Sequence, residues 1–235
     1  MVSAIIVAGG KGTRMKGSVC KQYLLLGDRP LLSHTLAAFD ACRFIDKIFL
    51  VIPEEDFEFC RKNIIFPVAW QKKLTLVSGG IERQDSVNNG LLAVGDTVES
   101  STDSIAVIHD GVRPFVRSDQ IEACIDGARQ FGACILGIPA FDTLKKVNDA
   151  GFIKETIKRD AVWLAQTPQA FQYSLIKTAH ENAKQNGYSG TDDASLVEYL
   201  GKNVKVIAGG RCNIKITTRE DLLLAKAILP SFTQN

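Results

Sequence analysis

Short apolar runs, most of them rich in β-branched residues, recur along this chain and alternate with segments of helical periodicity. The runs lie at residues 4–8, 47–52, 74–77, 104–109, 133–138 and 204–208. Apolar residues recur near a 3.6-residue period in segments 31–42, 85–94, 118–131 and 174–185, and Ser118 is a suitable N-cap. Continuous apolar runs are typical of strands that helices cover on both faces. The alternation therefore predicts an α/β fold with a doubly wound, mostly parallel sheet.

One segment, residues 142–159, departs from this alternation. Its short polar and apolar steps surround the turn sequence NDAG, which predicts a β-hairpin. An exposed hairpin inserted in an α/β domain offers its edges to a partner, which could be a second copy of the chain. No linker rich in Pro, Gly or Ser divides the sequence, so we expect one domain over residues 1–235 with an arm at about 139–160.

Charge and cysteine usage limit the classes of partner. The chain has 28 Lys and Arg against 26 Asp and Glu, a net charge of +2, which gives no chain-wide basic field for nucleic acid. No apolar run approaches the roughly 20 residues of a membrane span. The six cysteines form no CxxC pair and no leader sequence is evident. We therefore expect a cytoplasmic protein with reduced thiols that binds neither nucleic acid nor membranes.

The glycine-rich sequence AIIVAGGKGTRM, residues 4–15, follows the first predicted strand. Its glycines allow backbone N–H groups to surround an anion, which favours a phosphate ligand. A Walker loop is excluded because Lys11 is followed by Gly12 rather than by Ser or Thr. The dinucleotide fingerprint fails at Met15, where its third glycine should stand, so a dehydrogenase is a poor interpretation. The pattern indicates a phosphate loop of another kind.

The segments around this loop resemble those of known nucleotidyltransferases. AGGKGTRM, then KQY, then GDRP stand in the order found in enzymes that join a nucleoside triphosphate to a phosphorylated polyol or sugar. Further matches are GGIERQDSVNNGL, HDGVRPFV, DTLKKV, KRDAVWLAQTPQAF, TDDASLVE and GRCNIKITTREDL. Together they span nearly the whole chain, which resembles the 2-C-methyl-D-erythritol 4-phosphate cytidylyltransferase family of the non-mevalonate isoprenoid pathway. The fold implied is a Rossmann-like nucleotidyltransferase fold.

Two alternatives stay open at this point. The ribitol-5-phosphate cytidylyltransferase family shares the first loop, an HDxVRPF-like stretch and QTPQ, and Val112 suits both families, although DTLKKV and RDAVWLAQTPQAF favour methylerythritol phosphate. A catalytically silent nucleotide-binding regulatory module is the alternative of another class. The presence of Arg14, Lys21 and Asp110 argues against that module.

The resemblance implies a reaction in which a phosphate oxygen of methylerythritol phosphate attacks the α-phosphorus of CTP. The products are 4-diphosphocytidyl-2-C-methyl-D-erythritol and pyrophosphate. Because a phosphate monoester is ionised at neutral pH, no strong general base is required. The three histidines, His34, His109 and His180, therefore need no catalytic role, and His109 is expected to be a hydrogen-bonded structural residue. The main task is to stabilise charge at the α-phosphorus.

The resemblance also implies roles for individual residues. Arg14 and Lys21 would stabilise the triphosphate in the transition state. CTP would contact Ala8, Gly9, Gly10, Gly80 and Ser86, the last two at the cytosine. Ile81 replaces an acidic residue of some relatives, so only its backbone could contribute there. Asp110 would bind Mg²⁺ together with triphosphate oxygens.

The acceptor side is implied in the same way. The polyol phosphate would contact Asp110, Gly111, Arg113, Thr143, Arg159, Thr167, Thr191 and Lys215. Arg159 and Lys215 would position the phosphate of the acceptor for attack. Together with Arg14 and Lys21, they are the residues expected to be catalytic. Thr143 and Arg159 lie at the ends of the predicted arm, which in the family reaches a neighbouring subunit. We therefore expect a homodimer with composite sites.

Overall fold

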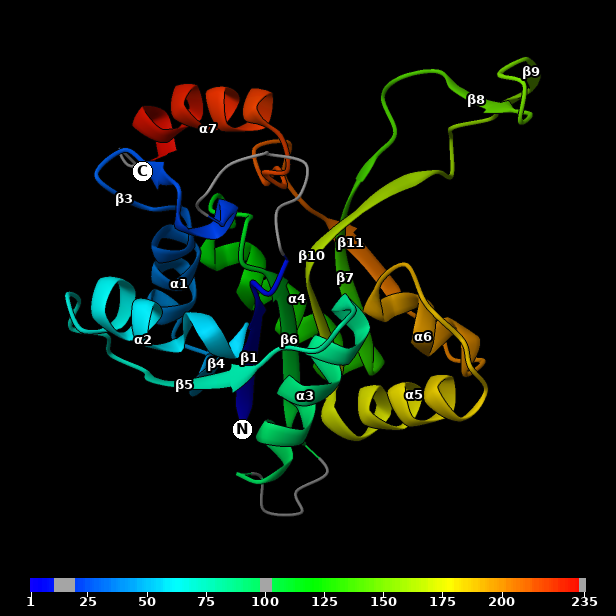
Figure 1. Cartoon of the computed structure of the whole chain (residues 1–235). Helices are drawn as coiled ribbons and strands as arrows, with labels where there is room; N and C mark the ends of the chain where they lie inside the picture. The colour runs from blue at the N-terminus through cyan, green and yellow to red at the C-terminus, as the bar shows by residue number, and fades with distance from the viewer. Residues whose placement is uncertain (11–19, 98–102, 233–235) are drawn as a thin grey trace.

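A seven-stranded sheet forms the centre of the computed structural model, which describes residues 1–10, 20–97 and 103–232 (Figure 1). Its strand order is β11-β7-β10-β6-β1-β4-β5. The strands are β1 (Val2–Val7), β4 (Lys47–Ile52), β5 (Lys73–Ser78), β6 (Ile105–Asp110), β7 (Ala133–Pro139), β10 (Trp163–Gln172) and β11 (Lys205–Ala208). All neighbours pair in parallel except β10, which is antiparallel to both β6 and β7. The mostly parallel sheet expected from the apolar runs is confirmed.

Helices cover both faces of this sheet. Successive residues of a strand point to opposite faces, so neighbouring residues of one strand pack against different helices. Ile6 packs in a buried cluster with α1 (Leu31–Ala41) and α4 (Ser118–Phe131), whereas its neighbour Ile5 packs in a second cluster. That second cluster includes side chains of α3 (Arg83–Gly95), α5 (Tyr173–Gln185) and α6 (Asp193–Tyr199). The doubly wound arrangement is therefore confirmed. None of the helices in the described part has the length and apolar character of a membrane span.

The remaining elements are short or peripheral. They are α2 (Phe57–Cys60), the 3₁₀ helices Lys21–Tyr23 and Glu54–Asp56, the π-helix Arg61–Ile65, the β2–β3 pair (Leu25–Leu26 and Arg29–Pro30) and α7 (Arg219–Phe232). The 3₁₀ helix Lys21–Tyr23 is anchored by the buried residues Gln22 and Tyr23, and the Tyr23 hydroxyl donates to Asp56 at 3.0 Å. These contacts therefore fix the backbone position of Lys21.

Two details differ from the sequence-based expectations. Ser118 is the first residue of α4 rather than its N-cap, since Arg117 occupies the cap position and the Gln120 side chain accepts from the Arg117 N–H at 3.2 Å. Strand β10 was not expected, because Pro168 and several polar residues interrupt its apolar pattern. An irregularity between Ala165 and Gln169 accommodates this segment in the sheet.

The predicted hairpin is confirmed as the antiparallel pair β8 (Leu144–Val147) and β9 (Ile153–Ile157). It projects from the upper end of the sheet, away from the body of the molecule (Figure 1). At its tip the Gly151 N–H donates to the Asn148 carbonyl, and Gly151 has a φ of 82°, which favours glycine. We call residues 139–160 the arm. Its large apolar side chains at Phe152 and Ile153 are exposed.

Candidate active site

The carboxyl ends of the central parallel strands bring the predicted ligand-binding segments to one edge. Val7 at the end of β1 is in register with Asp110 at the end of β6. On the other side of β1, the Ala8 N–H donates to the Val51 carbonyl and the Gly79 N–H to the Ile52 carbonyl. Residues 8–10, the described part of the glycine-rich sequence after β1, therefore lie between the segment around Gly80 and Asp110. Ligands bind at this edge in open α/β sheets.

The backbone of Gly9 and Gly10 lies between Ser86 and Lys21. A Cβ at Gly9 would stand 3.7 Å from Ser86 Oγ, and one at Gly10 would stand 3.9 Å from Lys21 Nζ. The Gly80 N–H donates to Ser86 Oγ at 3.0 Å, and a Cβ at Gly80 would collide with Asp85. Together with the buried Ala8, the predicted CTP residues thus form one group. Arg14 lies outside the described residues.

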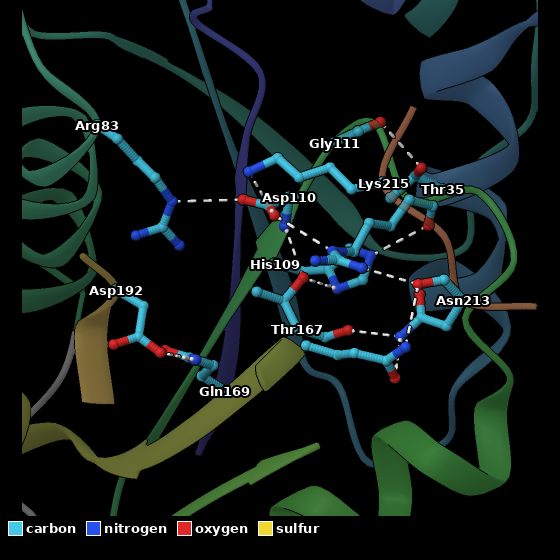
Figure 2. A network of polar contacts seen from close by, with 12 residues as sticks. Thr35, Arg83, His109, Asp110, Gly111, Thr167, Gln169, Asp192, Asn213 and Lys215 are labelled. Atoms are coloured by element: carbon cyan, nitrogen blue, oxygen red, sulfur yellow. Dashed lines mark hydrogen bonds and ion pairs between the residues drawn. The ribbon is translucent and has the colours of Figure 1, made fainter. Parts of the chain in front are cut away.

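Asp110 is a buried carboxylate at the centre of a cluster of cations that are themselves partly exposed (Figure 2). Its Oδ1 lies 3.3 Å from Arg83 Nε, and its Oδ2 lies 3.3 Å from Arg113 Nε and 3.0 Å from Lys215 Nζ. Burial acts to raise the pKa of Asp110, but Arg83, Lys215 and Arg113 together hold it below its usual range. The structure therefore brings Arg113 and Lys215 to Asp110 as ion-pair partners.

Arg83 was missed by the sequence interpretation. Besides Asp110, its guanidinium contacts Asp193 Oδ2 at 2.8 Å, so it joins two buried carboxylates. Burial alone would lower the pKa of Arg83, yet Asp193 and Asp110 raise it. Asp193 begins α6, where Gln169 Oε1 accepts from the Asp193 N–H at 3.2 Å. Arg83 lies within GGIERQDSV, but the sequence offers no sign that its partners come from two distant segments.

His109 is a neutral structural residue, as expected. Its Nε2 donates to the Arg113 carbonyl at 3.2 Å, and its Nδ1 accepts from the Thr167 hydroxyl at 3.0 Å. That hydroxyl in turn accepts from the Asp110 N–H at 3.1 Å. Burial lowers the pKa of His109 to about 3. The imidazole therefore connects three site residues without exchanging protons near neutral pH (Figure 2).

A pH dependence of stability follows from His109. The unfolded chain binds a proton on this histidine below about pH 6.5, whereas the folded protein does so only near pH 3. As the pH is lowered from about 6.5 to 3, the free energy of unfolding should therefore fall by about 1.4 kcal/mol per pH unit. His109→Gln should remove that slope in urea denaturation. His34→Gln is the control: burial also lowers the pKa of His34, so this variant should lose only the contribution of His34 and keep the slope due to His109. An unchanged slope in His109→Gln would contradict the assignment.

The remaining acceptor residues fall in three environments. Gly111 is packed closely, since a Cβ there would lie 2.8 Å from Ala8 Cβ, and its carbonyl accepts from Thr35 Oγ1 at 3.0 Å. Thr167 is buried, with its hydroxyl already bonded to His109. Thr143, Arg159 and Thr191 are exposed, the first two on the arm. The structure thus brings Gly111 and Thr167 to Asp110, whereas Thr143 and Arg159 belong to the arm, which projects away from the sheet (Figure 1).

The donor set for a cation is small. Among the described residues, no three His, Cys, Asp or Glu side chains gather as a metal site. Asp110 provides one ionised carboxylate at the ligand edge, and both its oxygens face positive groups. This set fits a Mg²⁺ ion only where phosphate oxygens supply most of the coordination, as is usual for nucleotide-bound Mg²⁺.

Comparisons with known proteins extend over nearly the whole chain. Residues 2–231 match the model of the family described as IspD, 2-C-methyl-D-erythritol 4-phosphate cytidylyltransferase. A protein of that name from Syntrophotalea carbinolica is 51% identical over 228 residues, which cover 97% of this chain and 96% of the relative.

Solved structures show the same similarity. The crystal structure of 4-diphosphocytidyl-2C-methyl-D-erythritol synthase from Anaerococcus prevotii has a TM-score of 0.84 at 34% identity, covering 97% of this chain and 96% of that one. The 2-C-methyl-D-erythritol 4-phosphate cytidylyltransferase from Thermus thermophilus has a TM-score of 0.75 at 30% identity, covering 98% and 100%. The Rossmann-like nucleotidyltransferase fold is confirmed.

Proposed function

The chain belongs to the 2-C-methyl-D-erythritol 4-phosphate cytidylyltransferase family, and we propose that the site around the glycine loop and Asp110 performs this transfer. A phosphate oxygen of methylerythritol phosphate forms a bond to the α-phosphorus of CTP. The bond from that phosphorus to the bridging oxygen breaks, and pyrophosphate leaves with the electron pair. The observation that carries the proposal is the grouping of Gly10, Ser86 and Lys21 beside the charge cluster of Asp110.

Each side of the site has a different task. The small residues Ala8, Gly9 and Gly10 leave room for the triphosphate, and Lys21 neutralises charge that builds at the α-phosphorus. Gly80 and Ser86, linked by a hydrogen bond, receive the cytosine. Lys215 and Arg113 lie on the far side of the Asp110 carboxylate, where they attract the acceptor phosphate. Arg14 is proposed to act with Lys21.

Mg²⁺ is the proposed cofactor, held by Asp110 and by oxygens of the triphosphate. When bound, the ion would neutralise phosphate charge and help pyrophosphate to leave. Asp110 suits this task because its neighbours keep it ionised in a buried position. Its present partners would then turn to the substrates, with Lys215, which is partly exposed, the most free to move.

The acceptor is tested by pyrophosphate release. We expect the protein with CTP and Mg²⁺ to release pyrophosphate with methylerythritol phosphate and at least tenfold more slowly with ribitol 5-phosphate. ATP, GTP and UTP should replace CTP poorly. Faster release with ribitol phosphate would assign the protein to the other acceptor, which the comparisons do not favour. Tight CTP binding without turnover would instead support a silent nucleotide-binding module.

We propose a homodimer in which the arm of one subunit completes the acceptor site of the other. The supporting observation is that the arm exposes Phe152 and Ile153 by 72% and 62%, far from the buried core of its own subunit. Thr143 and Arg159 lie on this arm, so they can contribute to an acceptor site only if that site belongs to a second subunit. A single 1–235 domain in the cytoplasm, bound to neither nucleic acid nor membrane, remains part of the proposal.

The arm predicts the effect of polar substitutions on assembly. Phe152→Ser combined with Ile153→Ser should weaken the dimer by about 100-fold or more, because each buried apolar side chain contributes about 1.5–3 kcal/mol. Sedimentation equilibrium measures the change, and activity should fall in parallel. Phe66→Ser is the matched control, since Phe66 is 75% exposed and follows the π-helix beside α2. An unaltered dimer in the double variant would place the interface elsewhere.

A further inference from the structure

The arm leaves the sheet where β7 ends and β10 begins. Pro139 pairs with Trp163, and the Ala140 N–H donates to the Val162 carbonyl at 2.9 Å. The next residue, Phe141, is half exposed, and from there the chain runs outward to β8. The course of the arm beyond Ala140 therefore depends on side-chain contacts made at its root.

Two arginines from different segments hold Phe141. The Arg159 guanidinium, on the returning side of the arm, donates to the Phe141 carbonyl. The Arg211 guanidinium lies over the Phe141 ring, 4.6 Å from the ring centre. A cation over an aromatic face is attracted by the ring quadrupole, so the ring has a preferred position beneath Arg211. Phe141 thus connects Arg159 to a residue outside the arm.

Arg211 belongs to a loop that is fixed to both strands at the arm's root. The Gly209 N–H donates to the Gly137 carbonyl of β7 at 2.7 Å. The Gln166 amide of β10 donates to the Gly210 carbonyl at 2.9 Å and accepts from the Gly210 N–H at 3.3 Å. The loop that contains Arg211 therefore cannot move relative to β7 and β10 without breaking these hydrogen bonds.

The same loop continues into the acceptor side of the candidate site. The Asn213 carbonyl accepts from Arg113 at 2.7 Å, and its amide donates to the Thr167 carbonyl at 2.8 Å. Lys215 follows two residues later and reaches Asp110. One short loop thus contacts the arm at one end and the Asp110 cluster at the other.

We propose that Arg211 is a positioning residue for the acceptor phosphate. It holds Phe141 on its own subunit, fixes the course of the arm, and so places Arg159 in the acceptor site of the partner subunit. Arg211 itself does not touch substrate. This inference rests on the dimer with composite sites proposed above, and the experiments below separate the two.

The first experiment measures both Michaelis constants. Arg211→Ala should raise KM for methylerythritol phosphate about two- to fivefold while kcat, KM for CTP and the dimer are retained. Arg211→Lys should restore part of the loss, and Phe141→Leu should reproduce it. The control is Lys205→Ala. Lys205 lies on the edge strand β11, just before the loop that carries Arg211, and makes a similar contact with the Phe131 ring, 5.5 Å from its centre. Unchanged KM for the acceptor, or loss of the dimer, would overturn the inference.

The second experiment uses heterodimers isolated through two affinity tags, with Lys215→Ala in one chain so that only the other body has an active site. Arg211→Ala should raise KM for the acceptor when it is in the Lys215→Ala chain, whose arm serves the active site. In the other chain it should have no effect, and the reverse pattern would refute action through the arm. Arg159→Ala tests the dimer itself: activity should be lost in the Lys215→Ala chain and kept in the other. Failure of that test would remove the composite site whatever Arg211 does.

Discussion

Replacing Lys21 by alanine is expected to lower kcat by about two to three orders of magnitude while KM for both substrates changes less. The ammonium group lies beside Gly10, in the segment proposed to bind the triphosphate. The 3₁₀ helix that begins with Lys21 is fixed by Gln22 and Tyr23, whose side chains are buried. A charge placed in advance stabilises the transition state without reorganisation, so its removal acts chiefly on the chemical step.

Two further variants are compared with Lys21→Ala, one that changes the shape of the cation at position 21 and one that removes a lysine elsewhere. Lys21→Arg keeps the charge but spreads it over a planar group, so we expect activity between those of the wild type and Lys21→Ala. Lys73→Ala, at the start of β5 and so at the opposite edge of the sheet, is the matched control. Single-turnover rates and circular dichroism of each variant should be recorded. A folded Lys21→Ala protein with kcat within tenfold of the wild type would refute the role.

The sequence predicted the central strands well because burial on both faces leaves an unambiguous apolar run. Expected residues 47–52 coincide with β4, and 133–138 with all but the last residue of β7. Strand β10 could not be recognised in this way. Gln166, Thr167 and Gln169 are buried there as hydrogen-bonding groups, so the strand lacks the apolar pattern that signals burial.

The candidate site was predicted residue by residue but not as a network. Asp110, Arg113 and Lys215 were each expected near the acceptor, whereas their ion pairs with one another depend on how distant segments meet. Arg83 was missed because Asp193 lies 110 residues further along the chain. The arm was recognised from its turn, since turn geometry is local. Contacts made by tertiary structure leave no comparable local pattern.

Asp110→Asn is expected to reduce the free energy of unfolding at pH 7 by about 3–5 kcal/mol, because it leaves Arg113 and Lys215 without their carboxylate and Arg83 with Asp193 alone. The asparagine has nearly the same shape, so packing is kept and the change reports on charge. Asp126→Asn is the control: its ion pair with Arg129 is exposed and should contribute less than about 1 kcal/mol. Urea denaturation measures both variants.

The pH dependence of this difference identifies its origin. The folded-state pKa of Asp110 is lowered, so its stabilising effect is complete above the ordinary aspartate value of about 3.9. It is lost as the pH falls from there toward the folded-state value, so the wild type and Asp110→Asn should converge in acid. A difference that stays constant in acid would show that lost packing, and not lost charge, destabilises the variant.

A second readout separates the electrostatic role of Asp110 from its proposed role as a Mg²⁺ ligand. In the absence of Mg²⁺, pyrophosphate should raise the melting temperature of Asp110→Asn more than that of the wild type, because Arg113 and Lys215 then lack their carboxylate and Arg83 keeps only Asp193. Catalysis should nevertheless fall by at least about 100-fold, since the variant cannot supply the carboxylate to the metal. If pyrophosphate stabilised both proteins equally, the cations around Asp110 would not be the groups that receive phosphate.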